Sequence, residues 1–303
     1  MAHNNHKHDH NYLLDDEIIA HNEKRTFFVV ILTSVMMVIE IIAGHMTSSM
    51  ALLADGWHMA SHAGALTISL VAYKLAKSGR LNQKFSFGAG KFIPLGGYTS
   101  AIALALIAIL MGFASGERLF SPVPIKFNEA ILVAVVGLIV NIICALLLTD
   151  KHHHHEHSHS SHTHDHNLKS AYVHVVADAL TSVFAIIALT LGKYYQAVWL
   201  DPVMGIVGAC VILRWAYLLC KETAWELLGG HAKSIDQNQI RELIESHGAE
   251  VSDLHIWRVA PNAHACELVI FSSKKKGTDH YRNLIDGEFK FSHLIVEERL
   301  CIH

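Results

Sequence analysis

The chain has 303 residues, of which 51% are hydrophobic and 17% charged, and its mean hydropathy is +0.30. A soluble domain is seldom this apolar, so the composition favours a membrane protein. The net charge of −3 and the lack of basic clusters with interleaved aromatic residues give no case for a nucleic-acid partner.

The N-terminal segment, residues 1–24, is polar and contains histidines that alternate with Asn, Lys and Asp. Such a segment cannot build a hydrophobic core, so we predict that it is disordered and cytoplasmic. We expect no cleavable signal peptide here, because polar sequence and Lys24-Arg25 precede the first apolar run. That run is therefore expected to remain as a membrane anchor.

Six apolar runs follow, each about long enough to cross the ~30 Å hydrocarbon layer of a bilayer. They predict an α-helical membrane domain over residues 25–222 with six transmembrane helices. The predicted spans are 26–43, 49–76, 92–113, 128–149, 168–191 and 199–220.

The distribution of Lys and Arg between the loops predicts the orientation. The loop between the second and third spans holds Lys74, Lys77, Arg80, Lys84 and Lys91, whereas the loop after the first span holds none. By the positive-inside rule, both termini are cytoplasmic. We expect a multi-pass protein of the cell membrane, the inner membrane of a bacterium.

Two of the predicted spans carry ionisable residues at helical spacing. Asp55, His58 and His62 fall at i, i+3 and i+7, and His174 and Asp178 are four residues apart. An ionisable group inside a bilayer costs about 3 kcal/mol or more unless it has a partner. Two facing helices would place four of them around one metal ion, and the predicted ligands are His58, His62, His174 and Asp178.

Three imidazoles with one carboxylate suit Zn²⁺, Co²⁺ or Ni²⁺ better than Ca²⁺ or Mg²⁺. The alternative is that these residues pair with each other and hold the helices together. Two pairs at ligand spacing favour metal binding. Asp55 could be a fifth ligand, orient a histidine or relay protons, and we favour the orienting role. For Glu40 and Asn141, also polar within spans, we favour hydrogen bonding between helices over lining the ion path.

Residues 151–167 form a low-complexity loop with nine histidines between the fourth and fifth predicted spans. It can bind divalent metal without a fixed geometry, and we interpret it as a flexible collector of ions rather than an inert linker. The candidate weak sites in this loop are His152, His153, His154, His155, His157 and His159.

Residues 223–303 return to the composition of a soluble domain and predict the element order α-β-β-α-β. Ser234 and Gln237 resemble a capping box at the start of the first helix. Strands are expected at 251–259 and 265–271, joined by a turn at Pro261-Asn262, followed by a helix near 279–289 and a strand near 294–300. A domain this small favours dimerisation. The five cysteines of the chain have no C-x-x-C spacing and are expected to be reduced thiols.

Several of these segments, taken together, resemble the cation diffusion facilitator family over nearly the whole chain. The matching motifs are Glu40-Ile41-Ile42-Ala43-Gly44, 49–55 with His58, Phe87-Gly88-Ala89-Gly90-Lys91, Val140-Asn141, 174–182, Asp201-Pro202-Val203 and 253–257. The His-x-x-x-His pair after Asp55-Gly56-Trp57 is similar to the cobalt- and nickel-exporting bacterial branch. His62 departs from the family pattern, which usually has Asp there.

The resemblance implies a homodimeric divalent-cation/proton antiporter that exports metal from the cytosol. It implies a tetrahedral site between spans two and five and a ferredoxin-like cytoplasmic domain. The family's ligand positions fall on His58, His62, His174 and Asp178. Soluble-domain ligands vary within the family, and His231, His247 and His255 are weak candidates for which surface solvation is the favoured interpretation.

Two other functions fit parts of the sequence. A membrane di-iron oxidoreductase uses His-x-x-x-His boxes, but here the pair His58/His62 lies inside a span and the cluster at 152–155 is low complexity. A metal sensor or storage protein would account for the histidine-rich segments but not for four ligands inside the membrane. We therefore predict a transporter and not an enzyme, with no resident cofactor and with metal ions, protons and the lipid bilayer as its partners.

Overall fold

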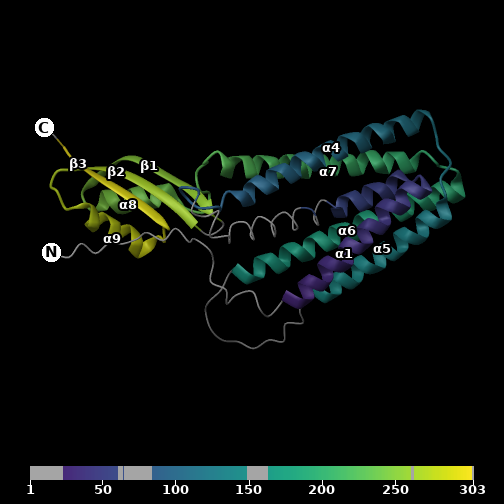
Figure 1. The fold of residues 1–303 in the computed structure, drawn as a ribbon, viewed down its shortest axis with the longest axis horizontal. Coiled ribbons are helices and arrows are strands. Elements are labelled where there is room, and N and C mark those ends of the chain that lie inside the picture. The colour runs from purple at the N-terminus through teal and green to yellow at the C-terminus, as the bar shows by residue number, and fades with distance from the viewer. Residues whose placement is uncertain (1–22, 61–63, 65–83, 149–162, 261–262, 302–303) are drawn as a thin grey trace. The chain divides into compact units, whose positions relative to one another are not determined.

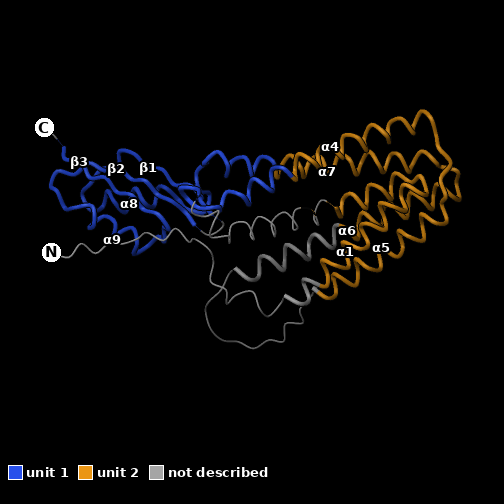
Figure 2. The backbone as a smooth tube through the Cα atoms, in the orientation of Figure 1, with its two compact units in different colours: residues 1–15, 68–99, 220–303 blue, residues 16–67, 100–219 orange. Residues whose placement is uncertain are grey.

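The computed structural model describes residues 23–60, 64, 84–148, 163–260 and 263–301, with side chains left out at 23–27, 148 and 163–177. The chain divides into two compact units, shown in different colours in Figure 2. Unit 1 comprises residues 1–15, 68–99 and 220–303, and unit 2 comprises residues 16–67 and 100–219. Each unit is described by itself.

Long helices account for most of unit 2, and two of them continue into unit 1. They are α1 (Glu23–Thr47), a helix over residues 50–60, α4 (Phe92–Phe120), α5 (Phe127–Leu148), α6 (Thr163–Tyr195) and α7 (Leu200–Leu227). Within the described residues, four stretches are long and apolar enough to cross a membrane, namely Phe28–Thr47, Phe92–Phe120, Phe127–Leu147 and Leu200–Leu227. The protein is therefore a helical membrane protein. Six spans remain a prediction, since part of the second lies outside the described residues and α6, the predicted fifth span, is not among these four stretches.

Several helices extend beyond the predicted spans, two of them by seven residues at the C-terminal end. We expected the third span to end at residue 113 and the sixth at 220, but α4 continues to Phe120 and α7 to Leu227. An apolar run predicts which residues lie in the hydrocarbon layer of the bilayer, and it does not predict where the helix ends. The backbone hydrogen bonds of a helix can continue past that run into polar sequence.

The helices of unit 2 form two packed groups. In one group, α5 contacts both α1 and α6 (Figure 1). In the other, Met50, Leu53 and Ala54 of helix 50–60 share an apolar cluster with side chains of α4 and α7. Many large apolar side chains on these helices are exposed, as expected for surfaces that face lipid rather than water.

The C-terminal part of unit 1 has the predicted element order. Its elements are α8 (Gln237–Ser246), β1 (Ala249–Ala260), β2 (Ala263–Ser272), α9 (Thr278–Glu288) and β3 (His293–Leu300). The sheet order is β1-β2-β3, with β1 and β2 antiparallel and β2 and β3 parallel. Ile240 and Ile244 of α8 and Ile285 of α9 pack with the buried strand residues in one core. The ferredoxin-like assignment remains a prediction, and the turn at Pro261-Asn262 lies outside the described residues.

The predicted capping box is wrong. Helix α8 begins at Gln237, and its N-cap is Asp236, whose side chain accepts a hydrogen bond from the Asn238 amide at 2.9 Å. The Ser234 hydroxyl is hydrogen-bonded to Nε2 of His264 instead, at 3.2 Å. Asp is as good an N-cap as Ser, so the sequence offered two possible helix starts and the later one is used.

The turn segment 84–91 packs on the sheet within unit 1. A Cβ added at Gly90 would lie 2.3 Å from the carbonyl oxygen of Val259, so only glycine allows this approach. Phe87 makes an edge-to-face contact with Trp257, and the Lys91 ammonium donates a hydrogen bond to the carbonyl oxygen of Glu226 near the end of α7. The start of α4 and the end of α7 are thereby tied to the sheet.

Candidate metal site

Two of the four predicted ligands are described with their side chains, and they lie together. His58 is on helix 50–60 and Asp178 is on α6, and both are buried, with 5% and 6% of their surface exposed. Nε2 of His58 is 3.4 Å from Oδ1 of Asp178. A direct charge-assisted hydrogen bond would be about 2.7–2.9 Å long. At 3.4 Å, a nitrogen and an oxygen that could both bind a metal lie near each other, farther apart than in a short charge-assisted hydrogen bond.

The observed separation agrees with the size of a tetrahedral metal shell. Two ligand atoms that each lie about 2.0–2.1 Å from one ion at the tetrahedral angle stand roughly 3.3–3.4 Å from each other. The His58–Asp178 separation of 3.4 Å is this edge length. The spacing of these two residues is that of two ligands of a small divalent transition metal, and their assignment as ligands stays a prediction.

The other two predicted ligands lie outside what the structure describes. His62 is not among the described residues, and His174 lies in α6 with its side chain left out. His174 is four residues before Asp178, so the helix places the two positions on the same face of α6. In the described part of the chain, no group of three His, Cys, Asp or Glu side chains is close enough to hold a metal.

Asp55 joins helix 50–60 to α6. It is 2% exposed, and each of its oxygens accepts one hydrogen bond from α6. The Thr181 hydroxyl donates to Oδ1 at 2.6 Å, and the Ser182 hydroxyl donates to Oδ2 at 2.6 Å. These bonds fix the carboxylate between the two helices that carry His58 and Asp178.

Thr181 and Ser182 had no assigned role in the sequence, although their spacing could have revealed one. They follow Asp178 by three and four residues, which places them on the same face of α6. Ser182 is fully buried and also lies 3.4 Å from the side-chain nitrogen of Asn141 on α5. Asn141 thus makes the hydrogen bond between helices that we favoured for it.

Glu40 is a further buried carboxyl group of unit 2. It lies on α1 with 0% of its surface exposed, and no hydrogen-bond partner for either oxygen is present among the described residues. A Cβ added at Gly137 of α5 would be 2.0 Å from its Oε1, and a Cβ added at Gly56 would be 3.2 Å from its Cβ. Two glycines therefore make the space that Glu40 occupies, and the described residues show no hydrogen bond from Glu40 to another helix.

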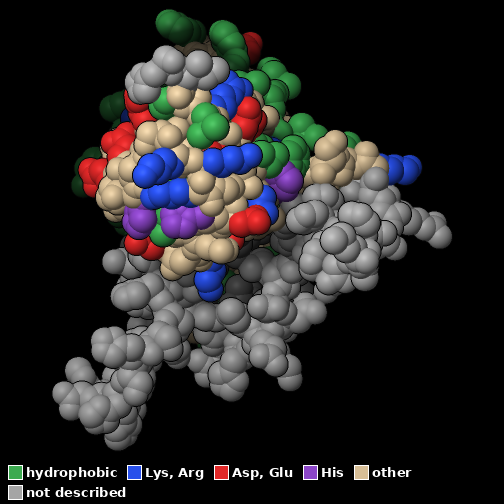
Figure 3. Space-filling model, turned by 90° about the vertical axis from the view of Figure 1, so that its left-hand side faces the viewer, with side chains coloured by type: hydrophobic (Ala, Val, Ile, Leu, Met, Phe, Trp, Pro, Cys, Tyr) green, Lys and Arg blue, Asp and Glu red, His purple; other side chains and the backbone are tan. Residues whose placement is uncertain are grey.

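The weak histidine candidates of the C-terminal domain have protein partners. His255 lies 3.0 Å from Asp253, and Nδ1 of His231 lies 2.9 Å from the Gln237 amide nitrogen. His247 faces the ring of His280 with ring centroids 6.4 Å apart. Figure 3, which looks onto this end of the molecule, shows histidine and basic side chains side by side on the surface. Surface solvation stays the favoured interpretation of these residues.

A cavity of about 340 Å³ in unit 1 is lined by two histidines, His231 and His264, with Arg258 and Glu226 beside them. Arg258 pairs with Glu226 at 2.5 Å. Burial, assisted by the charge of Arg258, lowers the pKa of His264, which keeps its imidazole neutral at physiological pH. The predicted weak sites of the histidine loop, residues 152–159, lie outside the described residues.

Comparison with known proteins relates this arrangement to metal transport. Residues 26–228 match the model of the cation efflux transmembrane domain. The chain belongs to the cation diffusion facilitator family. The proposed ligands of this cation diffusion facilitator, the residues that hydrogen-bond Asp55, and Glu40 all fall inside the matched region.

The matched relatives are named for metal transport. The chain is 31% identical over 258 residues to a cadmium, cobalt and zinc/H⁺-K⁺ antiporter of Bacillus subtilis, covering 82% of this chain and 80% of the relative. It is 32% identical over 241 residues to the zinc transporter ZitB of Pectobacterium atrosepticum, covering 78% and 72%. It is 26% identical to the metal cation efflux system protein CzcD of Cupriavidus metallidurans over 98% of this chain and 90% of the relative. The protein is therefore a divalent metal cation efflux transporter, in agreement with the predicted class.

Proposed function

We propose that this transporter exports Zn²⁺ and Co²⁺, and also Ni²⁺, from the cytosol in exchange for protons. The ions bind at His58, His62, His174 and Asp178, between helix 50–60 and α6. The observation that supports this most directly is the 3.4 Å separation of His58 Nε2 and Asp178 Oδ1 in a buried position. Zinc and cobalt also occur in the names of the relatives. Nickel enters the proposal from the resemblance of the His58/His62 pair to the cobalt- and nickel-exporting branch.

The donor set itself supports exchange with protons. Imidazole and carboxylate groups must lose their protons before they coordinate a metal, so metal and protons compete for the same atoms. An ion that loads from the cytosol displaces protons. Protons from a more acidic outer compartment displace the ion once the site faces outward. Asp55, held by Thr181 and Ser182, keeps helix 50–60 against α6 while this exchange occurs.

The remaining parts of the proposal concern the whole protein. Both termini lie in the cytosol, as the Lys and Arg distribution predicts, and the working form is a homodimer in the cell membrane. The histidine-rich loop 151–167 raises the local metal concentration at the cytosolic entrance. Asp55 orients the site, a role supported by the hydrogen bonds that its oxygens accept from Thr181 and Ser182 of α6.

The experiment that tests this proposal measures metal and proton flux in proteoliposomes that contain the full-length protein. His58→Ala and Asp178→Ala are compared with His45→Ala, which removes an exposed histidine at the end of α1. We expect Zn²⁺ and Co²⁺ flux with opposite proton flux in wild type and His45→Ala, and loss of both fluxes in the other two variants. Full exchange by His58→Ala and Asp178→Ala would remove these residues from the mechanism. Metal binding without any flux in wild type would indicate a storage protein or sensor.

A further inference from the structure

Asp201, in the first turn of α7, caps a helix other than its own. It is 1% exposed. Its Oδ1 accepts hydrogen bonds from the Ser49 hydroxyl at 2.6 Å and the Ala51 amide at 3.1 Å, and its Oδ2 accepts one from the Met50 amide at 2.7 Å. The first amides of an α-helix have no partner within the helix, so Asp201 satisfies two of these donors on helix 50–60.

Ser49 completes the cap. Its Oγ accepts a hydrogen bond from the Leu52 amide at 3.1 Å and donates its own hydrogen to Asp201. A negative charge at the N-terminus of a helix is also favourable because it faces the positive end of the helix dipole. The carboxylate of α7 and the start of helix 50–60 are therefore joined by hydrogen bonds and by charge.

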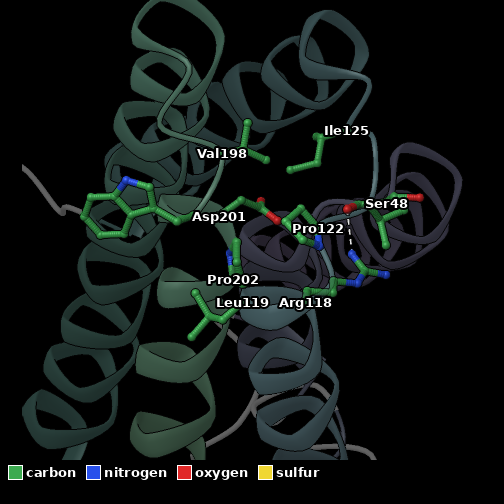
Figure 4. A pocket seen from close by; sticks show the side chains of 10 residues that line it. Ser48, Arg118, Leu119, Pro122, Ile125, Val198, Asp201 and Pro202 are labelled. Carbon is green, nitrogen blue, oxygen red and sulfur yellow. Dashed lines mark hydrogen bonds between the residues drawn. The ribbon is translucent and has the colours of Figure 1, made fainter.

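The turn before helix 50–60 is held from α4 as well. The Arg118 guanidinium donates to the carbonyl oxygen of Ser48 at 2.6 Å, and Ser48 has a φ of 56°, in the left-handed region that only Gly adopts easily. Arg118, Ser48 and Asp201 line one small pocket of about 40 Å³ (Figure 4). Two neighbouring helices thus fix the conformation of the turn that leads into helix 50–60.

Close packing carries this constraint along helix 50–60. A Cβ added at Gly205 of α7 would lie 2.8 Å from the Cβ of Met50, and one added at Gly208 would lie 2.6 Å from the Cβ of Ala54. Small residues let the two backbones approach closely. Helix α7 therefore supports helix 50–60 from its cap to the residue before Asp55.

We propose that Asp201 is a positioning residue of the metal site, because its cap sets the tilt and register of the helix that carries Asp55 and His58. This inference rests on the proposed role of His58 as a ligand. His58 lies about 12 Å along the helix from Met50, so a tilt of about 5° at the cap moves it by about 1 Å. A displacement of that size at a reacting or binding group can cost on the order of 100-fold in rate.

The test measures KM and kcat for Zn²⁺ transport by the full-length protein in proteoliposomes. Asp201→Ala removes all three hydrogen bonds, and Asp201→Asn keeps one acceptor oxygen but places an NH₂ group against a donor. The matched control is Glu129→Gln, which removes an exposed carboxylate from the first turn of α5. We expect KM to rise roughly tenfold in Asp201→Ala and roughly threefold in Asp201→Asn, with wild-type values in Glu129→Gln. A role in folding alone lowers the amount of active protein and leaves KM unchanged.

His58→Ala, measured in the same series, separates the two possible failures. If His58→Ala still transports, the proposed function fails and this inference fails with it. If His58→Ala is inactive while both Asp201 variants keep the wild-type KM, the positioning role alone is overturned. If Asp201→Ala yields no folded protein, Asp201→Asn decides, and a wild-type KM in that variant overturns the inference.

Discussion

The two units of the molecule place their charged side chains in opposite ways. All the buried carboxylates among the described residues lie in unit 2, and they are Glu40, Asp55, Asp178 and Asp201. In the C-terminal domain of unit 1 the described buried residues are apolar apart from Thr223 and Ser272, and none of the described carboxylates is buried. The membrane helices therefore keep carboxyl groups inside, where their charge is costly, while the small domain follows the usual pattern.

Three of these four buried carboxylates have partners that offset the cost. Asp55 and Asp201 each join two helices through hydrogen bonds, and Asp178 lies beside His58. A buried charge is stable only when it is paired, hydrogen-bonded or bound to a metal. We expect substitutions of these residues to change transport. Substitutions in the C-terminal domain should change its stability instead.

The largest effect that this comparison predicts is at Asp55. Asp55→Ala removes both hydrogen bonds that hold helix 50–60 to α6, so His58 and Asp178 lose their fixed separation. We expect metal affinity to fall roughly 10- to 100-fold, as for other residues that orient metal ligands. Isothermal titration of the detergent-solubilised protein with Zn²⁺ measures the change, and a wild-type Kd in Asp55→Ala would contradict the orienting role.

Two threonine variants test whether the hydrogen bonds to Asp55 cause the change in Kd. Thr181→Val removes one of the two hydrogen bonds to Asp55 and should give an intermediate Kd. Thr33→Val is its matched control, because within the described residues the Thr33 hydroxyl bonds to carbonyl oxygens of its own helix α1. We expect the wild-type Kd in Thr33→Val. Equal effects of the two threonine variants would indicate a general loss of helix stability.

A second effect is expected where Glu40 contacts Gly137. The Cβ of Gly137→Ala would lie 2.0 Å from Oε1 of Glu40, so the carboxyl group or a helix must move. Overpacking of this kind typically costs about 1–3 kcal/mol. Gly116→Ala in α4 is the control, since its Cβ meets nothing within 4 Å. The midpoint of thermal unfolding in detergent should fall in Gly137→Ala and stay the same or rise slightly in Gly116→Ala, where Ala favours the helix and meets no neighbour.

The sequence predicted the elements of the fold well because hydrophobic periodicity dominates them. The apolar runs located the described parts of the long helices, and the alternation over 251–259 and 265–271 located β1 and β2. Helix ends were less predictable. Lys221 marks the end of an apolar run, but α7 continues to Leu227 because backbone hydrogen bonding does not stop where the apolar residues stop.

The candidate site was only partly accessible from the sequence. His58 and Asp178 could be paired in advance because ionisable residues in apolar runs are rare and their spacing defines a helical face. The roles of Thr181 and Asp201 could not be read in the same way. Hydroxyl groups are common in membrane helices, and the hydrogen bonds of Asp201 are to Ser49, Met50 and Ala51, about 150 residues away. Contacts between distant segments need the tertiary structure.

In the C-terminal domain, a smaller effect is expected at Cys266. This thiol is fully buried in β2, and burial, followed by the charge of Glu267, raises its pKa to about 12. Cys266→Ser places a hydroxyl among apolar side chains and should cost about 1–2 kcal/mol. Cys301→Ser changes an exposed thiol and should cost nothing measurable. Thermal unfolding measures both variants, while Zn²⁺ transport per folded molecule should stay unchanged. A loss of transport in Cys266→Ser at unchanged stability would contradict the expectation that substitutions in the C-terminal domain affect stability and not transport.

The smallest effect concerns Glu298 of β3, which closes the turn before α9. Burial acts to raise the pKa of this carboxyl, but hydrogen bonds from the Lys276 amide, the Ser272 hydroxyl and the Gly277 amide lower it below the ordinary 4.5. A depressed pKa means that the stabilisation is present above pH 4.5 and is lost as the pH falls through the lowered value. Because the carboxylate is largely solvated, Glu298→Gln should cost only about 1 kcal/mol at neutral pH. Hydrogen exchange at the Lys276 and Gly277 amides, measured as the ratio of variant to wild-type protection, should show this cost at pH 7 and its decline below pH 4.5. A ratio that does not change with pH would mean that the charge of Glu298 contributes nothing. A ratio near one at every pH would mean that the carbonyl oxygen of Gln replaces the carboxylate fully.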